Sequence, residues 1–159
     1  MATFLKSLSD YDPANVPSGK GRRFSVIVSE YNSDITFALR DAAIETLLKH
    51  HVKEEDILLD HVPGTFELPS AAAMLYKKYK PDALICIGCV IKGETDHDKY
   101  INHAVAQGLV NLSLEILKPV IFGVLTPNTH QQALDRAGGK HGNKGVEAAF
   151  TALKMLGLQ

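Results

Sequence analysis

The feature that most constrains the fold is a regular alternation between short apolar runs and segments with helical spacing. Asp34–His50 shows the helical spacing most clearly, because its apolar residues recur about every three to four positions. The apolar runs are short and rich in β-branched residues, which is typical of strands. The sequence therefore predicts four strands, over Phe24–Ser29, Ile57–Val62, Ala83–Ile91 and Pro119–Leu125.

Helical segments alternate with these strands. Such alternation produces right-handed βαβ units, which give a parallel sheet with helices on both faces. The Ala83–Ile91 run is nearly all apolar, as expected of a strand buried on both faces. The expected fold class is α/β, a small doubly wound sheet of four parallel strands in a flavodoxin-like three-layer sandwich. The remaining helices are predicted over Pro69–Tyr79, Lys99–Leu117, Thr129–Ala137 and Gly145–Leu156.

The chain has 159 residues, which suits one domain of ordinary size. Residues 1–21 are expected to form an irregular N-terminal arm, because prolines and glycines interrupt any regular structure there. Residues 22–159 are expected to form a single α/β domain. Two alternatives stay open for the arm: a disordered tail, or a segment that lies on a neighbouring subunit.

Composition excludes several classes of partner. Lys and Arg number 17 against 18 Asp and Glu, and nucleic-acid or anionic-membrane binders usually carry a basic excess. No apolar run reaches the roughly 18 residues of a membrane span, and the first 21 residues contain no apolar signal core. With only two cysteines, the expected location is the reducing cytoplasm.

Ligands of doubly wound folds bind beyond the carboxyl ends of the strands, which directs attention to the segments after each predicted strand. Tyr31 follows the first strand and offers either an aromatic surface or a simple cover for a helix start. After the second strand, Pro63 and Gly64 predict a turn. Glu67 is then either an acid favoured at a helix N-terminus or an acceptor for the N–H edge of a planar heterocycle.

The segment after the third strand carries the most chemistry. Gly93 permits close backbone approach, and Thr95 can cap a helix whose exposed N–H groups bind phosphate. His97 falls in the first helical turn, where it is either a proton donor and acceptor or an ordinary surface histidine. Near the end of the chain, Arg136 and Lys144 flank a glycine-rich turn, which either holds an anion or is a solvated basic turn.

Metal and nucleotide-cofactor motifs are not supported. Cys86 and Cys89 match C-x-x-C, but they lie inside a predicted strand and should point to opposite faces as core residues. His97 and His103 lack the spacing of a metal-binding helix, and neither a P-loop nor a G-x-G-x-x-G follows the first strand. We therefore expect no metal and no organic cofactor.

Four blocks of this sequence, VIVSEYN, VPGTFELP, IGCVIKGETDH and RAGGKHGNKGVEAA, occur in the order and spacing of the lumazine synthase family. The resemblance covers about residues 24–157. It implies condensation of 5-amino-6-(D-ribitylamino)uracil with 3,4-dihydroxy-2-butanone 4-phosphate to 6,7-dimethyl-8-ribityllumazine, the penultimate step of riboflavin biosynthesis. That chemistry needs two substrates held together and protons moved, so the resemblance implies no cofactor.

The resemblance also implies roles for individual residues. His97 would donate and accept protons. Phe122 would cover the pyrimidine ring from a neighbouring subunit. The phosphate would be bound by Glu94, Thr95, Arg136 and Lys144. The pyrimidine and its ribityl chain would be bound by Tyr31, Thr65, Phe66, Glu67, Cys89, Val90 and Ile91.

One departure from the family pattern concerns the residues after the histidine. The family commonly has H-F-(D/E)-Y, whereas this chain has Asp98 in place of the aromatic residue and Lys99 in place of the acid. Together with Glu94 and Asp96, Asp98 makes the phosphate end more acidic.

The resemblance implies a homopentamer with sites between adjacent subunits. The short turn over residues 138–142 favours further assembly into an icosahedral shell of 60 subunits, with riboflavin synthase as a possible partner. Three rival interpretations remain: a non-catalytic flavin or lumazine carrier, a structural shell protein with vestigial catalysis, and a flavodoxin-class electron carrier. The last would need a Ser/Thr-rich phosphate loop after the first strand, and residues 30–34 match it poorly.

Overall fold

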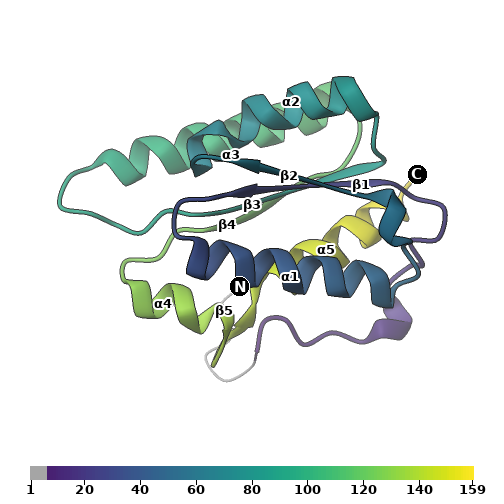
Figure 1. Ribbon diagram of the computed structural model, residues 1–159, viewed down its shortest axis with the longest axis horizontal. Coiled ribbons are helices and arrows are strands. Elements are labelled where there is room, and N and C mark those ends of the chain that lie inside the picture. Colours follow the sequence, from purple (N-terminus) through teal and green to yellow (C-terminus); the bar gives the residue numbers. More distant parts are fainter. Residues whose placement is uncertain (1–6) are drawn as a thin grey trace.

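A computed structural model describes residues 7–159 and contains a four-stranded sheet in the order β2-β1-β3-β4. Every neighbouring pair in this sheet is parallel, which confirms the predicted α/β fold class. β1 lies at the centre with β3, while β2 and β4 form the two edges (Figure 1). The strands are β1 (Phe24–Ser29), β2 (Ile57–Val62), β3 (Ala83–Cys89) and β4 (Val120–Leu125).

Helices cover both faces of the sheet, as Figure 1 shows. On one face lie α1 (Ser33–Lys49) and α5 (Lys144–Leu156), which pack against each other. On the other face lie α2 (Leu68–Tyr79) and α3 (His97–Ile116). Because successive strand residues point to opposite faces, the sheet contributes to a separate hydrophobic core on each side.

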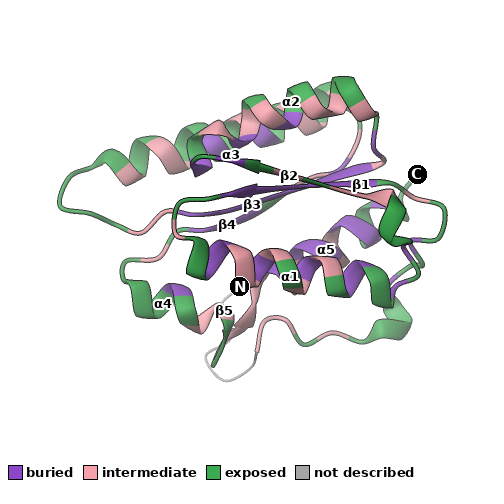
Figure 2. Ribbon diagram, in the orientation of Figure 1, coloured by how far each residue is buried: buried purple, intermediate pink, exposed green. Residues whose placement is uncertain are grey.

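The two central strands are buried throughout, whereas the helices keep an exposed outer side (Figure 2). On β1, Val26 and Val28 belong to the core beneath α1 and α5, and Ile27 belongs to the core beneath α2 and α3. Cys86 and Cys89 are likewise divided between the two cores, which confirms their predicted opposite orientation. Both cysteines are unpaired.

Three predicted boundaries differ from the structure by two residues, and the others agree to within one. β3 ends at Cys89 rather than Ile91, although the backbone N–H of Val90 still donates to the carbonyl of Leu125 (2.9 Å). α3 begins two residues earlier than predicted, at His97. The predicted helix 129–137 is shorter, because α4 (His130–Asp135) is followed by an antiparallel pair, β5 (Ala137–Gly139) and β6 (Gly142–Asn143).

Three short 3-10 helices complete the described structure: η1 (Pro13–Asn15), η2 (Glu54–Asp56) and η3 (Thr65–Glu67). The last of them lies in the segment after β2 and leads directly into α2. It therefore presents the residues of the VPGTFELP block at the carboxyl end of the sheet.

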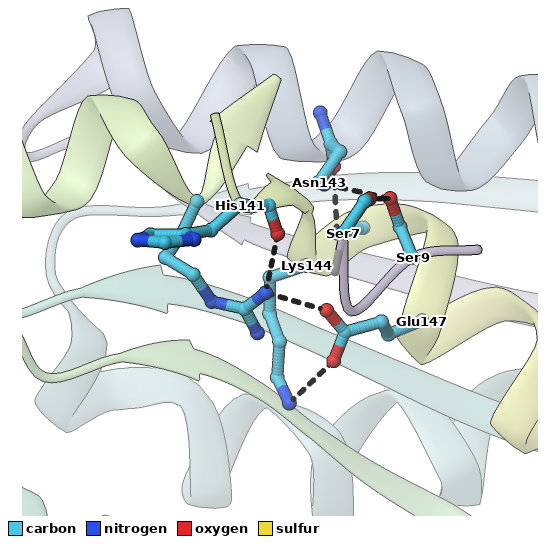
Figure 3. A network of polar contacts seen from close by, with 8 residues as sticks. Ser7, Ser9, His141, Asn143, Lys144 and Glu147 are labelled. Atoms are coloured by element: carbon cyan, nitrogen blue, oxygen red, sulfur yellow. Dashed lines mark hydrogen bonds and ion pairs between the residues drawn. The ribbon is translucent and has the colours of Figure 1, made fainter. Parts of the chain in front are cut away.

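The arm packs against its own chain from residue 7 onward. The hydroxyl of Tyr11 is hydrogen-bonded to Nε2 of His50 (2.9 Å), and its ring lies 4.9 Å from that of Phe150. Ser9 Oγ accepts a hydrogen bond from the backbone N–H of Asn143 (3.1 Å; Figure 3). The described part of the arm therefore contacts α5, β6 and the residue that follows α1 of its own chain. Residues 1–6 lie outside the described part of the arm.

Candidate active site

A cavity of about 370 Å³ opens at the carboxyl ends of β1 and β3. This is where the doubly wound topology places a ligand, because the loops leaving neighbouring strands diverge there. The cavity brings together residues that are far apart in the sequence. Seven predicted site residues line it: Tyr31, Thr65, Cys89, Val90, Ile91, Thr95 and His97.

A second cavity of about 320 Å³ adjoins the first, with Tyr31 and His97 in the walls of both. It adds Phe66 and Glu67 to the set of predicted residues. The rings of Tyr31 and Phe66 are 67% and 58% exposed and line the same cavity. Adjoining exposed rings of this kind are typical of a surface that binds a ligand or partner. A flat heterocycle can pack against such rings while its polar edge reaches a carboxylate.

Backbone hydrogen bonds fix the segment after β1. The N–H of Tyr31 donates to the carbonyl of Pro63 (2.9 Å), which joins this segment to the end of β2. Asn32 adopts the left-handed conformation (φ 58°, ψ 47°), which asparagine tolerates better than most residues. Its Nδ2 donates to the carbonyl of Cys89 (2.9 Å), and Asn32 itself lines the cavity. The Tyr31 ring is therefore carried on a backbone tied to both neighbouring strands.

Gly64 and Glu67 make the turn after β2. The N–H of Gly64 donates to Oε2 of Glu67 (2.9 Å), so one carboxylate oxygen caps the turn. A Cβ on Gly64 would lie 2.8 Å from the Tyr31 ring, closer than a real contact permits. Glu67 also lines the second cavity. Both interpretations of Glu67 are therefore compatible with its position, and glycine is needed to seat the Tyr31 ring.

The loop between β3 and α3 carries the residues predicted to bind phosphate. Lys92 N–H donates to the carbonyl of Pro127 (3.0 Å), which fastens this loop to the segment after β4. Thr95 Oγ1 accepts a hydrogen bond from the N–H of His97 (3.4 Å), so it helps to start α3. The side chain of His97 is exposed at the rim of both cavities. Glu94 is exposed and lines neither of them.

The remaining predicted residues lie elsewhere on the chain. Arg136 and Lys144 line a separate hollow of about 300 Å³ beyond the carboxyl end of β4. Phe122 lies on the edge strand β4 and lines a further hollow, of about 410 Å³, together with Lys144 and residues of α5. A single chain therefore carries the predicted residues as two separate groups.

Glu147 organises the basic group. Its Oε1 lies 2.8 Å from Nη1 of Arg136, and its Oε2 lies 3.4 Å from Nζ of Lys144. Nη1 of Arg136 also donates to the carbonyl of His141 (2.9 Å). Figure 3 shows Glu147 beside Lys144 at the start of α5. The two cationic side chains thus share one largely buried carboxylate, which does not fit the interpretation of this segment as a solvated basic turn.

Comparison with known proteins bears on both groups. Residues 21–159 match the family described as 6,7-dimethyl-8-ribityllumazine synthase. The chain belongs to this family. It is 54% identical to the 6,7-dimethyl-8-ribityllumazine synthase of Porphyromonas gingivalis, over all of this chain and 99% of that relative. It is 50% identical to that of Phocaeicola vulgatus over 98% of this chain and 93% of the relative. Identity to that of Aquifex aeolicus is 47%, covering 89% and 92% respectively.

Within a lumazine synthase fold, sequence reasoning overlooked two residues of this chain. Asn32 was missed, although an asparagine directly after a strand is a signal for a left-handed residue that turns the chain. Glu147 was missed because its only sequence signal is its spacing of three from Lys144 on a helix. Asp98, noticed only as a departure from the family pattern, lines the main cavity.

The two thiols of this lumazine synthase chain are shielded. Burial raises the pKa of Cys86 to about 12. Burial, with a smaller contribution from the charge of Asp34, raises the pKa of Cys89 to about 12 as well. Cys89 therefore contributes shape to the cavity and not a thiolate nucleophile.

Residues 7–159 contain no group of three or more His, Cys, Asp or Glu side chains placed to hold a metal ion. No helix in this range combines the length and apolar character of a membrane-crossing segment.

Proposed function

We propose that the chain condenses 5-amino-6-(D-ribitylamino)uracil with 3,4-dihydroxy-2-butanone 4-phosphate to give 6,7-dimethyl-8-ribityllumazine. The observation that carries the proposal is the pair of adjoining cavities, which collects nine predicted residues from three separate loops of a family member. The exposed Tyr31 and Phe66 rings hold the pyrimidine. Glu67 accepts from its N–H edge with the oxygen that the turn leaves free.

Residues around the start of α3 perform the chemistry. His97 moves protons at the rim that the two cavities share. Thr95 and the backbone around Gly93 bind the phosphate of the second substrate, and Glu94 contributes through its backbone N–H. Val90 and Ile91 complete the pyrimidine wall next to Cys89. Holding two reactants in contact supplies a large part of the acceleration, so the reaction proceeds without a cofactor.

Two neighbouring subunits complete each site. Phe122 lies on the edge strand β4, and Arg136 and Lys144 lie beyond its carboxyl end, so that all three are away from the cavities of their own chain. An adjacent copy that docks this edge onto the cavities would bring the basic side chains to the phosphate and Phe122 to the pyrimidine. Contacts between two different surfaces of identical subunits, here the cavities and the β4 edge, can close into a ring, and we propose a pentamer.

Further assembly into a 60-subunit shell is proposed on the short β5-β6 turn. Light scattering tests it, since a species no larger than a pentamer contradicts the shell. The candidate partner of such a shell is riboflavin synthase, and its co-purification with the assembled protein tests that partnership. A cytoplasmic location is proposed on the two unpaired cysteines.

The first experiment mixes the purified protein with both substrates and follows lumazine formation by absorbance. Turnover supports the proposed reaction. No turnover combined with tight binding of lumazine or riboflavin contradicts it and favours a non-catalytic carrier. Absence of both turnover and binding favours a structural shell protein.

Subunit complementation tests the shared site. Tyr31→Ala damages only the cavity half and Arg136→Ala only the basic half. We expect each variant alone to lose at least about tenfold in kcat/KM. Equal mixtures co-assembled by co-expression should recover about a quarter of the parental activity, because about a quarter of the interfaces then join two intact halves. A site contained in one subunit would show no recovery.

A further inference from the structure

Two acceptor oxygens are enclosed without a partner on α3. Oδ1 of Asp98 and Oδ1 of Asn102 are both shielded from solvent, and neither has a hydrogen-bond partner among residues 7–159. The two residues are four apart on one helix, so their side chains are neighbours on the same face. An enclosed carboxylate oxygen without a donor is costly, and such a group calls for a physical explanation.

Asp98 also lines the main cavity, next to His97 and Thr95. The nearest lysine in sequence does not neutralise it, because Lys99 Nζ pairs with Asp96 (2.9 Å). Within the described chain Asp98 takes part in no ion pair. The cavity of this chain therefore contains a carboxylate whose hydrogen-bonding capacity is not used by the fold.

The amide of Asn102 can satisfy one oxygen of Asp98. Asparagine carries two N–H donors as well as one acceptor. A half-turn of the amide would exchange its oxygen and nitrogen, so that Nδ2–H of Asn102, one helical turn away, would face Oδ1 of Asp98 as a donor. The same exchange would move the oxygen of Asn102 out of its enclosed position. The second oxygen of Asp98 remains available to a donor in the cavity.

We propose that Asp98, held by Asn102, is a catalytic residue that accepts a hydrogen bond from the attacking 5-amino group of the pyrimidine substrate. This inference rests on the proposed condensation. A carboxylate repels the phosphate of the other substrate, whereas an amine offers it two N–H groups. The amine must also reach the ketone beside His97, the residue next to Asp98.

The bond-forming step explains why a negative charge helps. The amine nitrogen donates its lone pair to the ketone carbon, the C–N bond forms, and the electrons of the C=O π bond move to oxygen. The oxygen gains one proton and the nitrogen loses one, which leaves a neutral carbinolamine. Positive charge develops on nitrogen during this step, and a carboxylate hydrogen-bonded to its N–H groups stabilises that charge more than it stabilises the neutral amine.

Asp98→Asn tests the charge while keeping the shape of the side chain. We expect kcat/KM for the pyrimidine to fall about tenfold, since a hydrogen bond to a charged group is replaced by one to a neutral group. The matched control is Asp96→Asn, two residues before Asp98 in the sequence. It removes the same charge, but the side chain of Asp96 is exposed and lines neither cavity. It should retain parental kinetics.

An analogue isolates the contact. Inhibition by 6-(D-ribitylamino)uracil, which lacks the 5-amino group, should be the same for the parent and Asp98→Asn. Binding of the product lumazine, whose ring nitrogen at that position bears no hydrogen, should likewise be unchanged. Equal weakening of the analogue and the substrate would overturn the assignment, because Asp98 would then contact another part of the pyrimidine or support the fold.

Asn102→Ala tests the positioning role. It should lower the same kcat/KM by about threefold, and adding it to Asp98→Asn should cost little more, because both changes act through one carboxylate. Parental kinetics in Asp98→Asn would overturn the proposal. A change in assembly size, measured by light scattering, with unchanged KM and kcat would overturn the proposal as well. The donor to Asp98 would then belong to a neighbouring subunit. Failure of the parent to make lumazine is a separate result, against the proposed function itself.

Discussion

The cavity at the ends of β1 and β3 is preorganised for a ligand in a different way from the basic edge, which consists of Arg136 and Lys144 beside β4. The cavity is shaped by backbone: Asn32 ties two strands together, and Gly64 makes room for an aromatic ring. The edge is shaped by charge, since Glu147 holds Arg136 and Lys144 in place. The cavity is therefore shaped to bind a flat, largely neutral ring, whereas the basic edge holds two cationic side chains in ion pairs with Glu147.

This difference predicts that the two halves respond to different substrates. Changes of shape at the cavity should affect the pyrimidine, whereas changes of charge at the edge should affect the phosphate-bearing substrate. The following variants test that division, beginning with the largest expected effect.

Arg136→Ala should lower kcat/KM for the keto-phosphate by about ten- to a hundredfold, because a guanidinium forms strong paired hydrogen bonds with phosphate oxygens. The KM for the pyrimidine should change little. Steady-state kinetics with each substrate varied in turn measure both. Arg136→Lys should fall in between, since an ammonium lacks the planar fork. Equal losses toward both substrates would contradict the division between the two halves.

Gly64→Ala should lower kcat/KM for the pyrimidine by about tenfold, because the new methyl group displaces the Tyr31 ring. The backbone at Gly64 is extended (φ −132°), so alanine adds no conformational strain there. Circular dichroism and light scattering should therefore match the parent. Parental kinetics in this variant would show that the Tyr31 ring does not need its position.

Glu147→Gln should strengthen binding of inorganic phosphate by about threefold to tenfold, because it releases Arg136 and Lys144 from an opposing charge. Competitive inhibition by phosphate against the keto-phosphate gives the affinity. The pyrimidine KM serves as the internal control. Weaker phosphate binding would show that Glu147 acts mainly by holding Arg136 in its binding orientation.

The arm belongs to neither half, and it offers a change that should affect stability alone. Tyr11→Phe removes the hydroxyl bonded to His50 but keeps the ring contact with Phe150. We expect the free energy of unfolding to fall by about 1 kcal/mol, measured by urea denaturation, with unchanged kinetics. A loss of turnover would connect the arm to the site.

His50 should make the stability depend on pH. Burial, with a smaller effect from the charge of His51, lowers the pKa of His50 below its ordinary value of 6.5. Between the two pKa values of His50 the folded state binds fewer protons than the unfolded state. The contribution of neutral His50 to the free energy of unfolding is therefore complete above about pH 6.5, and it declines as the pH falls toward the lower pKa of the folded state. Urea titrations between pH 7.5 and 5 should show a shallower decline in His50→Gln than in the parent.

Much of the fold was predictable because it depends on local patterns. Strand positions agreed closely for β1 and β2, where β-branched runs have clear limits. The end of β3 was wrong by two residues, because Val90 and Ile91 continue the apolar pattern after the pairing has changed to loop hydrogen bonds. The β5-β6 pair was not predicted, since two glycines with positive φ are as typical of a plain turn.

For the candidate site, the residue types and motif order were visible in the sequence, and the proximity of the residues was not. Glu147 has the spacing of an ordinary helical ion pair with Lys144, and its ion pair with Arg136 spans the β5-β6 turn. Asp98 looked like a departure on an acidic loop, and only packing shows that one of its oxygens is enclosed.

By itself, the sequence determined the alternation of strands and helices, the chemistry available at each strand end, and membership of the lumazine synthase family. Local periodicity and motif spacing are properties of neighbouring residues, so they can be read along the chain. The tertiary structure alone decided which strand ends share a cavity, which predicted residues are left on the opposite edge, and which carboxylate lacks a partner. Those outcomes depend on long-range packing and burial, which no short stretch of sequence contains.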